Sequence, residues 1–142
     1  MSSAYDIASY VAVTLAKGTL GSTVMVNIRP DQPDNLIAVF EYGGRPSDSG
    51  MGNPDSDALE NVNVQIVVRN KDASVAHSTA YSIYKSLDGL GGVTINSTEY
   101  LFMRALQPPF LLSRDSSGAQ PVGAGNRAAF AFNLEIEKRR TT

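Results

Sequence analysis

Residues 60–90, ENVNVQIVVRNKDASVAHSTAYSIYKSLDGL, change within a few positions from a two-residue repeat of apolar side chains to a helical repeat. The first part alternates, which predicts a strand whose dry face is formed by Val62, Val64, Ile66 and Val68. Asp72 can accept hydrogen bonds from the free N–H groups at a helix start, and Gly89 is typical of a helix end. Between them, apolar residues recur at helical spacing: Ala76, Ala80, Ile83, Tyr84, Leu87 and Leu90. The stretch therefore predicts a buried strand followed by a helix packed over it.

The composition bounds the size and the general chemistry of the chain. A length of 142 residues with 42% hydrophobic content is enough for one core, so we expect a single domain over 1–142. Twelve basic and fourteen acidic residues give a net charge of −2, which provides no broad positive surface for nucleic acid. The chain has no cysteine, which excludes disulfides and thiolate metal sites. Residues 1–18 lack the pattern of a signal peptide or membrane span, so we expect neither secretion by that route nor a membrane partner.

The flanking segments predict the remaining elements. A helix is expected over 3–17, with Ser3 and Asp6 as its capping pair. Short strands are expected at 24–29, 36–42, 93–96, 99–106, 110–114 and 130–137. Two stretches rich in Gly, Pro, Ser and Asp predict long loops at about 43–57 and 115–126, and a basic tail is expected over 138–142. The order predicts an α+β domain with a mostly antiparallel sheet and two helices packed on one face.

No motif in the chain makes a convincing catalytic or cofactor site. GAGNRA at 123–128 matches the letters of a dinucleotide fingerprint, but Pro121 stands where a strand should lie and a strand pattern follows where a helix is needed. His77 is the only histidine, and a serine triad would need distant partners to converge on it. The loop acids do not have calcium-loop spacing: Asp48, Asp55, Asp57 and Glu60. We therefore expect no enzymatic activity, cofactor or metal; a small ligand-binding or enzymatic α+β domain is the less favoured alternative.

Surplus apolar residues indicate self-association. Residues 36–42 are largely apolar on both faces, and 100–103 form a similar run, although helices on one side of a sheet cover only one of its faces. Each such side chain left in water would forgo about 1.5 to 3 kcal/mol, and contiguous apolar patches often mark interfaces. The predicted contacts between copies are Phe40, Tyr42, Arg69, Phe102, Arg104, Glu135 and Glu137. Arg69→Glu or Phe40→Asp is expected to leave a folded monomer that no longer assembles with other copies.

An ordered set of short motifs connects the chain to a known family. The set is NVQIVVR at 63–69, a helix closing on LDG at 87–89, QPPFL at 107–111, RDSSG at 114–118 and NR at 126–127. From residue 5 to residue 139 the chain resembles the small minor capsid or tail terminator proteins of long-tailed bacteriophages. The resemblance implies a ring-forming protomer without catalytic site or cofactor, located in the tail or neck of the virion and in the host cytoplasm during assembly.

The same resemblance implies the partners. The ring, usually hexameric, caps the head-proximal end of the tail tube, stops its polymerisation and provides the docking surface for the head connector. DNA passes through such a ring without direct reading of its sequence. We expect the tube or connector contacts to include Arg45, Asp48, Asp55, Asp57, Arg114, Asp115, Arg127, Lys138, Arg139 and Arg140. Another neck component, a head completion protein or a connector adaptor, is the alternative role.

Overall fold

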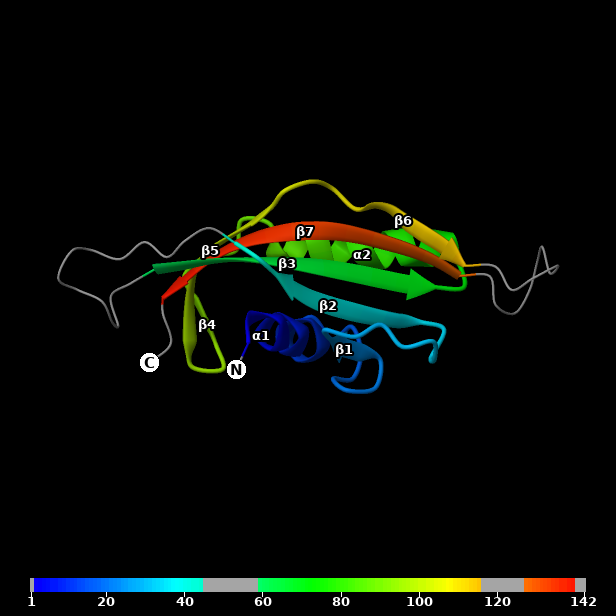
Figure 1. Cartoon of the computed structure of the whole chain (residues 1–142), viewed down its shortest axis with the longest axis horizontal. Helices are drawn as coiled ribbons and strands as arrows, with labels where there is room; N and C mark the ends of the chain where they lie inside the picture. Colours follow the sequence, from blue (N-terminus) through cyan, green and yellow to red (C-terminus); the bar gives the residue numbers. More distant parts are fainter. Residues whose placement is uncertain (1, 45–58, 116–126, 140–142) are drawn as a thin grey trace.

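The computed structural model describes residues 2–44, 59–115 and 127–139, which form helices and one curled sheet (Figure 1). The elements, in chain order, are α1 (Ser3–Ser9), the π-helix η1 (Tyr10–Thr14), β1 (Val24–Val26), β2 (Leu36–Tyr42), β3 (Leu59–Asn70), α2 (Ala73–Leu87), β4 (Val93–Ile95), β5 (Thr98–Ala105), β6 (Phe110–Asp115) and β7 (Arg127–Arg139). This order confirms the predicted α+β class.

The sheet is seven-stranded and mostly antiparallel, with strands in the order β1-β2-β3-β7-β5-β4. Only the β1–β2 pair is parallel among the described strands. β5 and β6 share one edge of β7: β5 pairs with residues 134–138 and β6 with residues 127–131. Pro108 and Pro109 lie between them, where their missing N–H groups interrupt the ladder as predicted.

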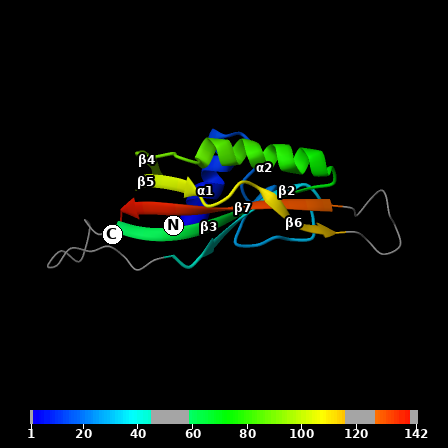
Figure 2. The ribbon, with the colours of Figure 1, turned by 90° about the horizontal axis from the view of Figure 1, so that it is seen from above.

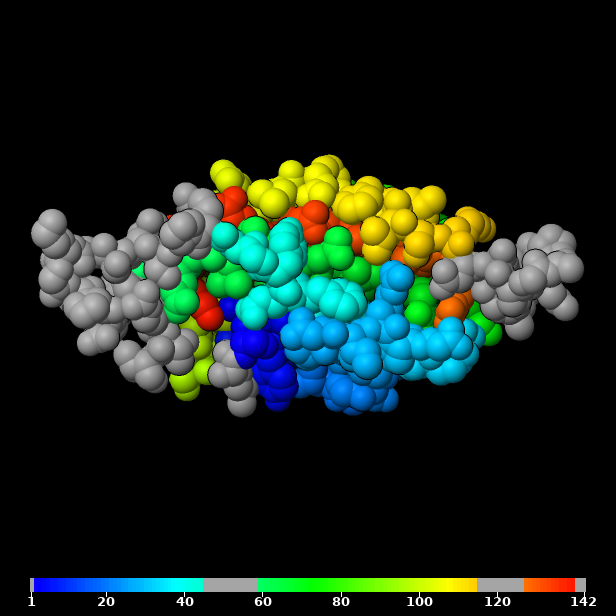
Figure 3. Space-filling model, viewed as in Figure 1, coloured from blue at the N-terminus to red at the C-terminus, as the bar shows by residue number. Residues whose placement is uncertain are grey.

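Both helices cover the same face of the sheet. Ala80, Ile83 and Leu87 of α2 belong to one buried cluster with Ile7 and Val11 of the N-terminal helical segment. The dry face predicted for the central strand enters that cluster through Val64, Ile66 and Val68. Figure 2 shows α2 lying along the sheet on one side. We call the other side, which Figure 3 views, the open face.

The predicted ends of the central helix are confirmed. Asp72 accepts a 2.9 Å hydrogen bond from the Ser74 N–H, which satisfies one of the free donors of the first turn. Gly89 has a φ of +82°, a conformation that strains any residue with a side chain. Its N–H donates to the Met103 carbonyl across to β5 at 2.8 Å. This hydrogen bond therefore also positions the segment between α2 and β4 against β5.

The first helix differs from its prediction. Ser2, not Ser3, is the N-cap, because its hydroxyl accepts from the Tyr5 N–H at 3.2 Å. Asp6 is not a capping residue: it is buried and accepts hydrogen bonds from the Tyr100 hydroxyl and from Asn96. The helix then widens into η1, where the Leu15 N–H donates to the Tyr10 carbonyl. A tertiary partner therefore determined the role of Asp6.

A small second cluster lies on the open face. It explains Val67, the one residue that breaks the alternation of the central strand, because Val67 packs there. Its other buried members are Leu36, Ala38, Ala129 and Ala131. Residues 36–39 are thus enclosed within one chain, and the expectation that 36–42 needs a second copy for cover is wrong over those residues. Short side chains and a connection that crosses this end of the sheet, described below, provide the cover.

The chain end also differs from its prediction. Lys138 and Arg139 belong to β7 and not to a tail, since Leu59 pairs with Arg139 and Tyr100 with Lys138. Lys138 is buried there. The two predicted long loops lie almost wholly outside the described residues.

Candidate functional site

Four predicted contact residues line one hollow of about 250 Å³ on the open face: Phe102, Arg104, Glu135 and Glu137. Asn61 of β3 completes the lining. The register produces this grouping, because Phe102 pairs with Glu137 and Arg104 with Glu135 across β5 and β7. Residues two apart on a strand share a face, so both pairs lie side by side. We call these five residues the open-face hollow.

The hollow combines charge with an exposed aromatic ring. Arg104 Nη2 lies 2.9 Å from Glu135 Oε2, and the Arg104 side chain is more than half exposed. Exposed pairs of this kind contribute about 0 to 1 kcal/mol to stability, so the fold does not depend on it. Phe102 is 44% exposed although it is a large apolar residue. An uncovered aromatic ring beside a guanidinium is suited to contact with another protein surface.

The two predicted contact residues on β2 differ in exposure. Phe40 is half-buried because it packs against the second cluster. Tyr42 is exposed at 41%, and partial burial still raises the pKa of its hydroxyl. Tyr42 pairs with Asn63, two residues along β3 from Asn61 of the hollow. Of these two residues, Tyr42 is the one whose side chain is available to a partner, whereas substituting Phe40 also disturbs packing within the chain.

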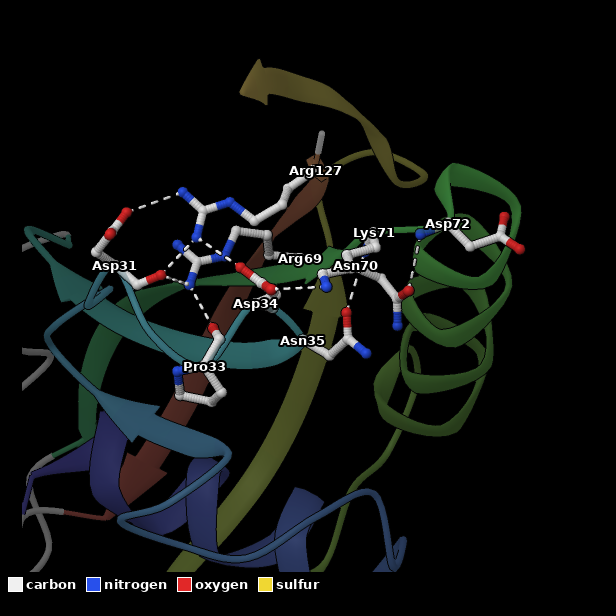
Figure 4. Close-up of polar contacts among 9 residues, drawn as sticks. All are labelled: Asp31, Pro33, Asp34, Asn35, Arg69, Asn70, Lys71, Asp72 and Arg127. Atoms are coloured by element: carbon white, nitrogen blue, oxygen red, sulfur yellow. Dashed lines mark hydrogen bonds and ion pairs between the residues drawn. The ribbon is translucent and has the colours of Figure 1, made fainter. Parts of the chain in front are cut away.

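Arg69 occupies a buried position inside the chain (Figure 4). Its side chain donates to carbonyl oxygens of the connection between β1 and β2: Pro30 at 2.7 Å, Asp31 at 3.2 Å, Pro33 at 2.6 Å and Asp34 at 3.1 Å. Arg69 is only 3% exposed. Its predicted contact with another copy stays a prediction, but Arg69→Glu would remove these bonds, so that variant is not a clean test of assembly.

Two further cations hold the same connection. Arg127 Nη2 lies 3.0 Å from Asp31 Oδ1, and Arg127 Nη1 lies 3.4 Å from Asp34 Oδ1. Lys71 Nζ lies 3.1 Å from Asp34 Oδ2. The hydrogen bond from Lys71 holds the pKa of the Asp34 carboxyl below its usual range, and the charges of Arg127 and Arg69 act in the same direction. We call residues 30–34 with Arg69, Lys71 and Arg127 the arginine clamp.

The remaining predicted contact residues are scattered. Arg114 is exposed on β6, and Asp115 ends that strand. Arg139 forms a 3.0 Å ion pair with Glu99 at the far end of the sheet. Arg45, Asp48, Asp55, Asp57 and Arg140 lie outside the described residues. The structure therefore brings the β5 and β7 residues together, while the tube or connector contacts form no single cluster among the described positions.

Sequence reasoning missed the exposed apolar residues of β6. Leu111 is 53% exposed, and Phe110 and Leu112 are also exposed. The signal was present as the apolar run 110–112 between a Pro-Pro pair and a loop-forming stretch. That context shortens the strand and places it at the sheet edge, where its side chains receive little cover.

Neither a metal centre nor a membrane span is found in the described ranges. Within 2–44, 59–115 and 127–139, no three His, Cys, Asp or Glu side chains are grouped to hold a metal ion. Over those same ranges, no helix is both long and apolar enough to cross a membrane. His77 is exposed on α2, with its ring 5.2 Å from that of Phe130 and 6.1 Å from that of Tyr81.

Comparison with known proteins identifies one family. A family model described as bacteriophage tail terminator protein matches residues 14–122. The matched segment holds every described element from β1 to β6, whereas α1 and β7 lie outside it. A search of curated proteins returns no match.

Proposed function

Because this chain belongs to the bacteriophage tail terminator family, we propose that its copies form a closed ring that caps the tail tube and ends its polymerisation. The family resemblance implies six copies in the ring. Family membership confirms the resemblance seen in the sequence and makes the chain a structural protein of the phage tail. Ring formation, the number of copies and the joining of head to tail are the finer parts of the proposal. Assembly would take place in the host cytoplasm before the tail is complete.

The open-face hollow is the observation that supports contact between copies. Phe102 remains 44% exposed beside two carboxylates and a guanidinium, on the side of the sheet opposite α2. Aromatic and arginine side chains are enriched at the centres of protein interfaces. Tyr42 extends the exposed surface along β2. Burial of these groups by a neighbouring copy would add apolar contact and charge pairing together.

The proposed partners follow from the position of a terminator in a tail. One side of the ring meets the tail tube protein, and the other offers the head connector a docking surface. Arg114 on β6 is an exposed cation available for such contacts. Arg139 near the end of β7 is also exposed, although it pairs with Glu99 within the chain. A net charge of −2 agrees with DNA passing through the ring without direct recognition.

Electron microscopy of the purified protein, alone and mixed with tail tubes that lack heads, tests the proposal. We expect rings in the first sample and a ring at one end of each tube in the second. Phe102→Asp should reduce ring formation, and Ile28→Asp, at a somewhat more exposed apolar residue outside the hollow, should not. Rings that never bind tubes would indicate another neck component. A protein without rings that leaves tubes uncapped would contradict the proposed function.

A further inference from the structure

The edge strand β6 presents an apolar ridge to solvent. The exposed residues of this ridge are Phe110, Leu111 and Leu112, and we call them the β6 ridge. β6 pairs with β7 on one side, and within the described residues no strand pairs with its other side. An exposed edge of this kind carries unpaired backbone donors and acceptors beside apolar side chains. Such edges are sites for contact with a further chain.

The ridge projects on both faces of the sheet. Phe110 lies opposite Ala131 of the open face, whereas Leu111 lies opposite Phe130 on the helix side. A register shift between Leu111 and Ser113 interrupts the ladder beside Leu112. Exposed apolar groups on both sides of one strand do not form a flat patch. They form a convex edge, whose best complement is a concave surface.

A concave surface of that kind lies between η1 and β4. It is a hollow of about 510 Å³ whose apolar lining comes from Tyr10, Val13, Val93 and Ile95. Val13 is 75% exposed, the highest exposure of any large hydrophobic residue in the described part of the chain. Pockets of roughly 300 to 1,000 Å³ are large enough to bury whole ligands, so several side chains can enter. We call it the η1–β4 groove.

The ridge and the groove of one molecule cannot meet. In Figures 1 and 2, β6 lies toward one end of the molecule and β4 toward the other, with the sheet and α2 between them. Only a second molecule can therefore bring a ridge to a groove. Two different surfaces that match each other produce a head-to-tail contact, which closes into a ring when the rotation between copies permits.

Charge at the two surfaces is complementary. Arg114 is exposed on β6 directly after the ridge, and no carboxylate is paired with it among the described residues. Glu99 lies beside the groove, opposite Thr94 of β4; its half-exposed carboxylate pairs with Arg139 within the chain and has further acceptor positions for a second guanidinium. Opposite charges at the rim of an apolar contact favour the correct orientation of the two molecules.

We propose that the β6 ridge of one copy enters the η1–β4 groove of the next copy. This inference rests on the proposed ring and deepens it, because it names the two different surfaces that a head-to-tail ring requires. The contact shares no residue with the open-face hollow, so both can operate in the same assembly. It also makes a second copy, and not another class of protein, the occupant of the groove.

Two complementary variants test the proposal in solution by light scattering after size exclusion. Leu111→Asp disables the ridge and leaves the groove, whereas Val13→Asp disables the groove and leaves the ridge. Both positions are exposed, so the fold should be kept, and Ile28→Asp is the matched control. Each variant alone should associate at least about tenfold more weakly than the wild type. An equimolar mixture should form dimers and nothing larger, because the intact ridge of Val13→Asp binds the intact groove of Leu111→Asp and no second pair of intact surfaces remains.

The outcomes separate this contact from the ring itself. Wild-type-like rings from both variants would overturn the ridge-to-groove contact and leave the ring proposal standing. Dimers formed by either variant alone as readily as by the equimolar mixture would show that the ridge and the groove do not join the copies, which also overturns it. A wild type that stays monomeric in solution and leaves tubes uncapped would overturn this proposal together with the proposed function. Leu111→Ser and Val13→Ser replace the Asp variants if circular dichroism shows that these are unfolded.

Discussion

At the residue scale, Arg69 is the side chain on which the connection between β1 and β2 depends. A guanidinium has several donors in a fixed plane, which suits it to several carbonyl oxygens at once. The Arg69 side chain donates to four carbonyls of residues 30–34. Each of these peptide groups would otherwise need another donor near the surface of the sheet.

Arg69→Gln should lower the free energy of unfolding by about 2 to 4 kcal/mol, because hydrogen bonds to a charged group are lost and carbonyls are left without their donor. Chemical denaturation with a matched Arg104→Gln variant measures the effect. Arg104 is exposed and makes a surface ion pair, so its substitution should change stability by no more than about 1 kcal/mol. Equal losses in both variants would contradict the structural role of Arg69.

Tyr100 predicts a loss of stability at alkaline pH. Burial and the hydrogen bond to Asp6 raise the pKa of the Tyr100 hydroxyl. The unfolded chain releases that proton near the ordinary pKa of about 10, whereas the folded chain keeps it. The contribution of this hydroxyl to stability is therefore complete below the unfolded-state pKa of about 10, and it decreases as the pH rises above that value. Thermal melts across this range should show a steeper decline for the wild type than for Tyr100→Phe.

The control for this experiment is Tyr81→Phe, which changes an exposed tyrosine of α2. Its alkaline decline should match that of the wild type. If Tyr100→Phe declines equally steeply, the buried hydroxyl is not the group responsible. At neutral pH Tyr100→Phe should be less stable than the wild type, since Asp6 is buried and loses a donor.

The residues that sequence reasoning placed well are those whose partners are local. Asp72 bonds to the N–H two residues later, and Gly89 needs only its own backbone conformation. The role of Asp6 was predicted wrongly, and the partners of Arg69 within the chain were missed, because in both cases the partners lie far away in the sequence. Arg69 bonds to residues 35 to 39 positions earlier, and Asp6 bonds to Asn96 and Tyr100, 90 and 94 positions later. Such partners depend on the tertiary fold.

At the scale of elements, β3 and β7 were predictable because their alternation reports one buried face. β3 pairs with β7 over the whole length of β3, from Leu59 with Arg139 to Asn70 with Ala128. The cover of the other face was not predictable in this way. Leu36 and Ala38 were expected to need another copy, but the arginine clamp holds a segment without regular periodicity across that end of the sheet.

The arginine clamp predicts local opening in acid. The hydrogen bond from Lys71 is the main reason that the pKa of Asp34 is lowered in the folded chain. In the unfolded chain this pKa is about 4. The contribution of the Asp34 carboxylate to stability is therefore complete above that pH and is lost as the pH falls through the lower pKa of the folded chain. Amide hydrogen exchange should show residues 27–35 losing protection at low pH before the central strands do.

Asp34→Asn supplies the test of cause, because it removes the charge at every pH. The variant should show the more open connection already at neutral pH and little further change in acid. Asp88→Asn is a suitable comparison, since Asp88 lies at the end of α2, away from the clamp. Simultaneous loss of protection in the connection and in β3 would contradict a local effect.

At the scale of the whole molecule, sequence reasoning identified most of one surface and none of another. Phe102, Arg104, Glu135 and Glu137 could be grouped because a strand period of two puts alternate residues on one face, and their pairing across β5 and β7 then forms the hollow. The η1–β4 groove has no such signal. It depends on how far the sheet curls toward η1, which no local pattern encodes.

Self-assembly makes stability depend on protein concentration. When association is linked to folding, anything that binds only the folded chain raises the melting temperature as its concentration rises. Across an about 100-fold range of concentration, the wild type should therefore show a rising melting temperature. Phe102→Asp should show a smaller rise while it matches the wild type at the lowest concentration, because Phe102 is 44% exposed in the single chain and its loss leaves the core intact.

Ile28→Asp provides the matched control, since it places the same charge at an exposed apolar residue outside the hollow. Its melting temperature should follow that of the wild type at every concentration. Phe102→Asp adds a like-charge contact with Glu137 across the strands at every concentration. The dependence on concentration reports the further cost to a neighbouring copy of desolvating the new carboxylate. Identical, concentration-independent melting of all three proteins would show that the exposed ring of Phe102 is not buried by another copy, and the open face would then have to serve the tube or the connector instead.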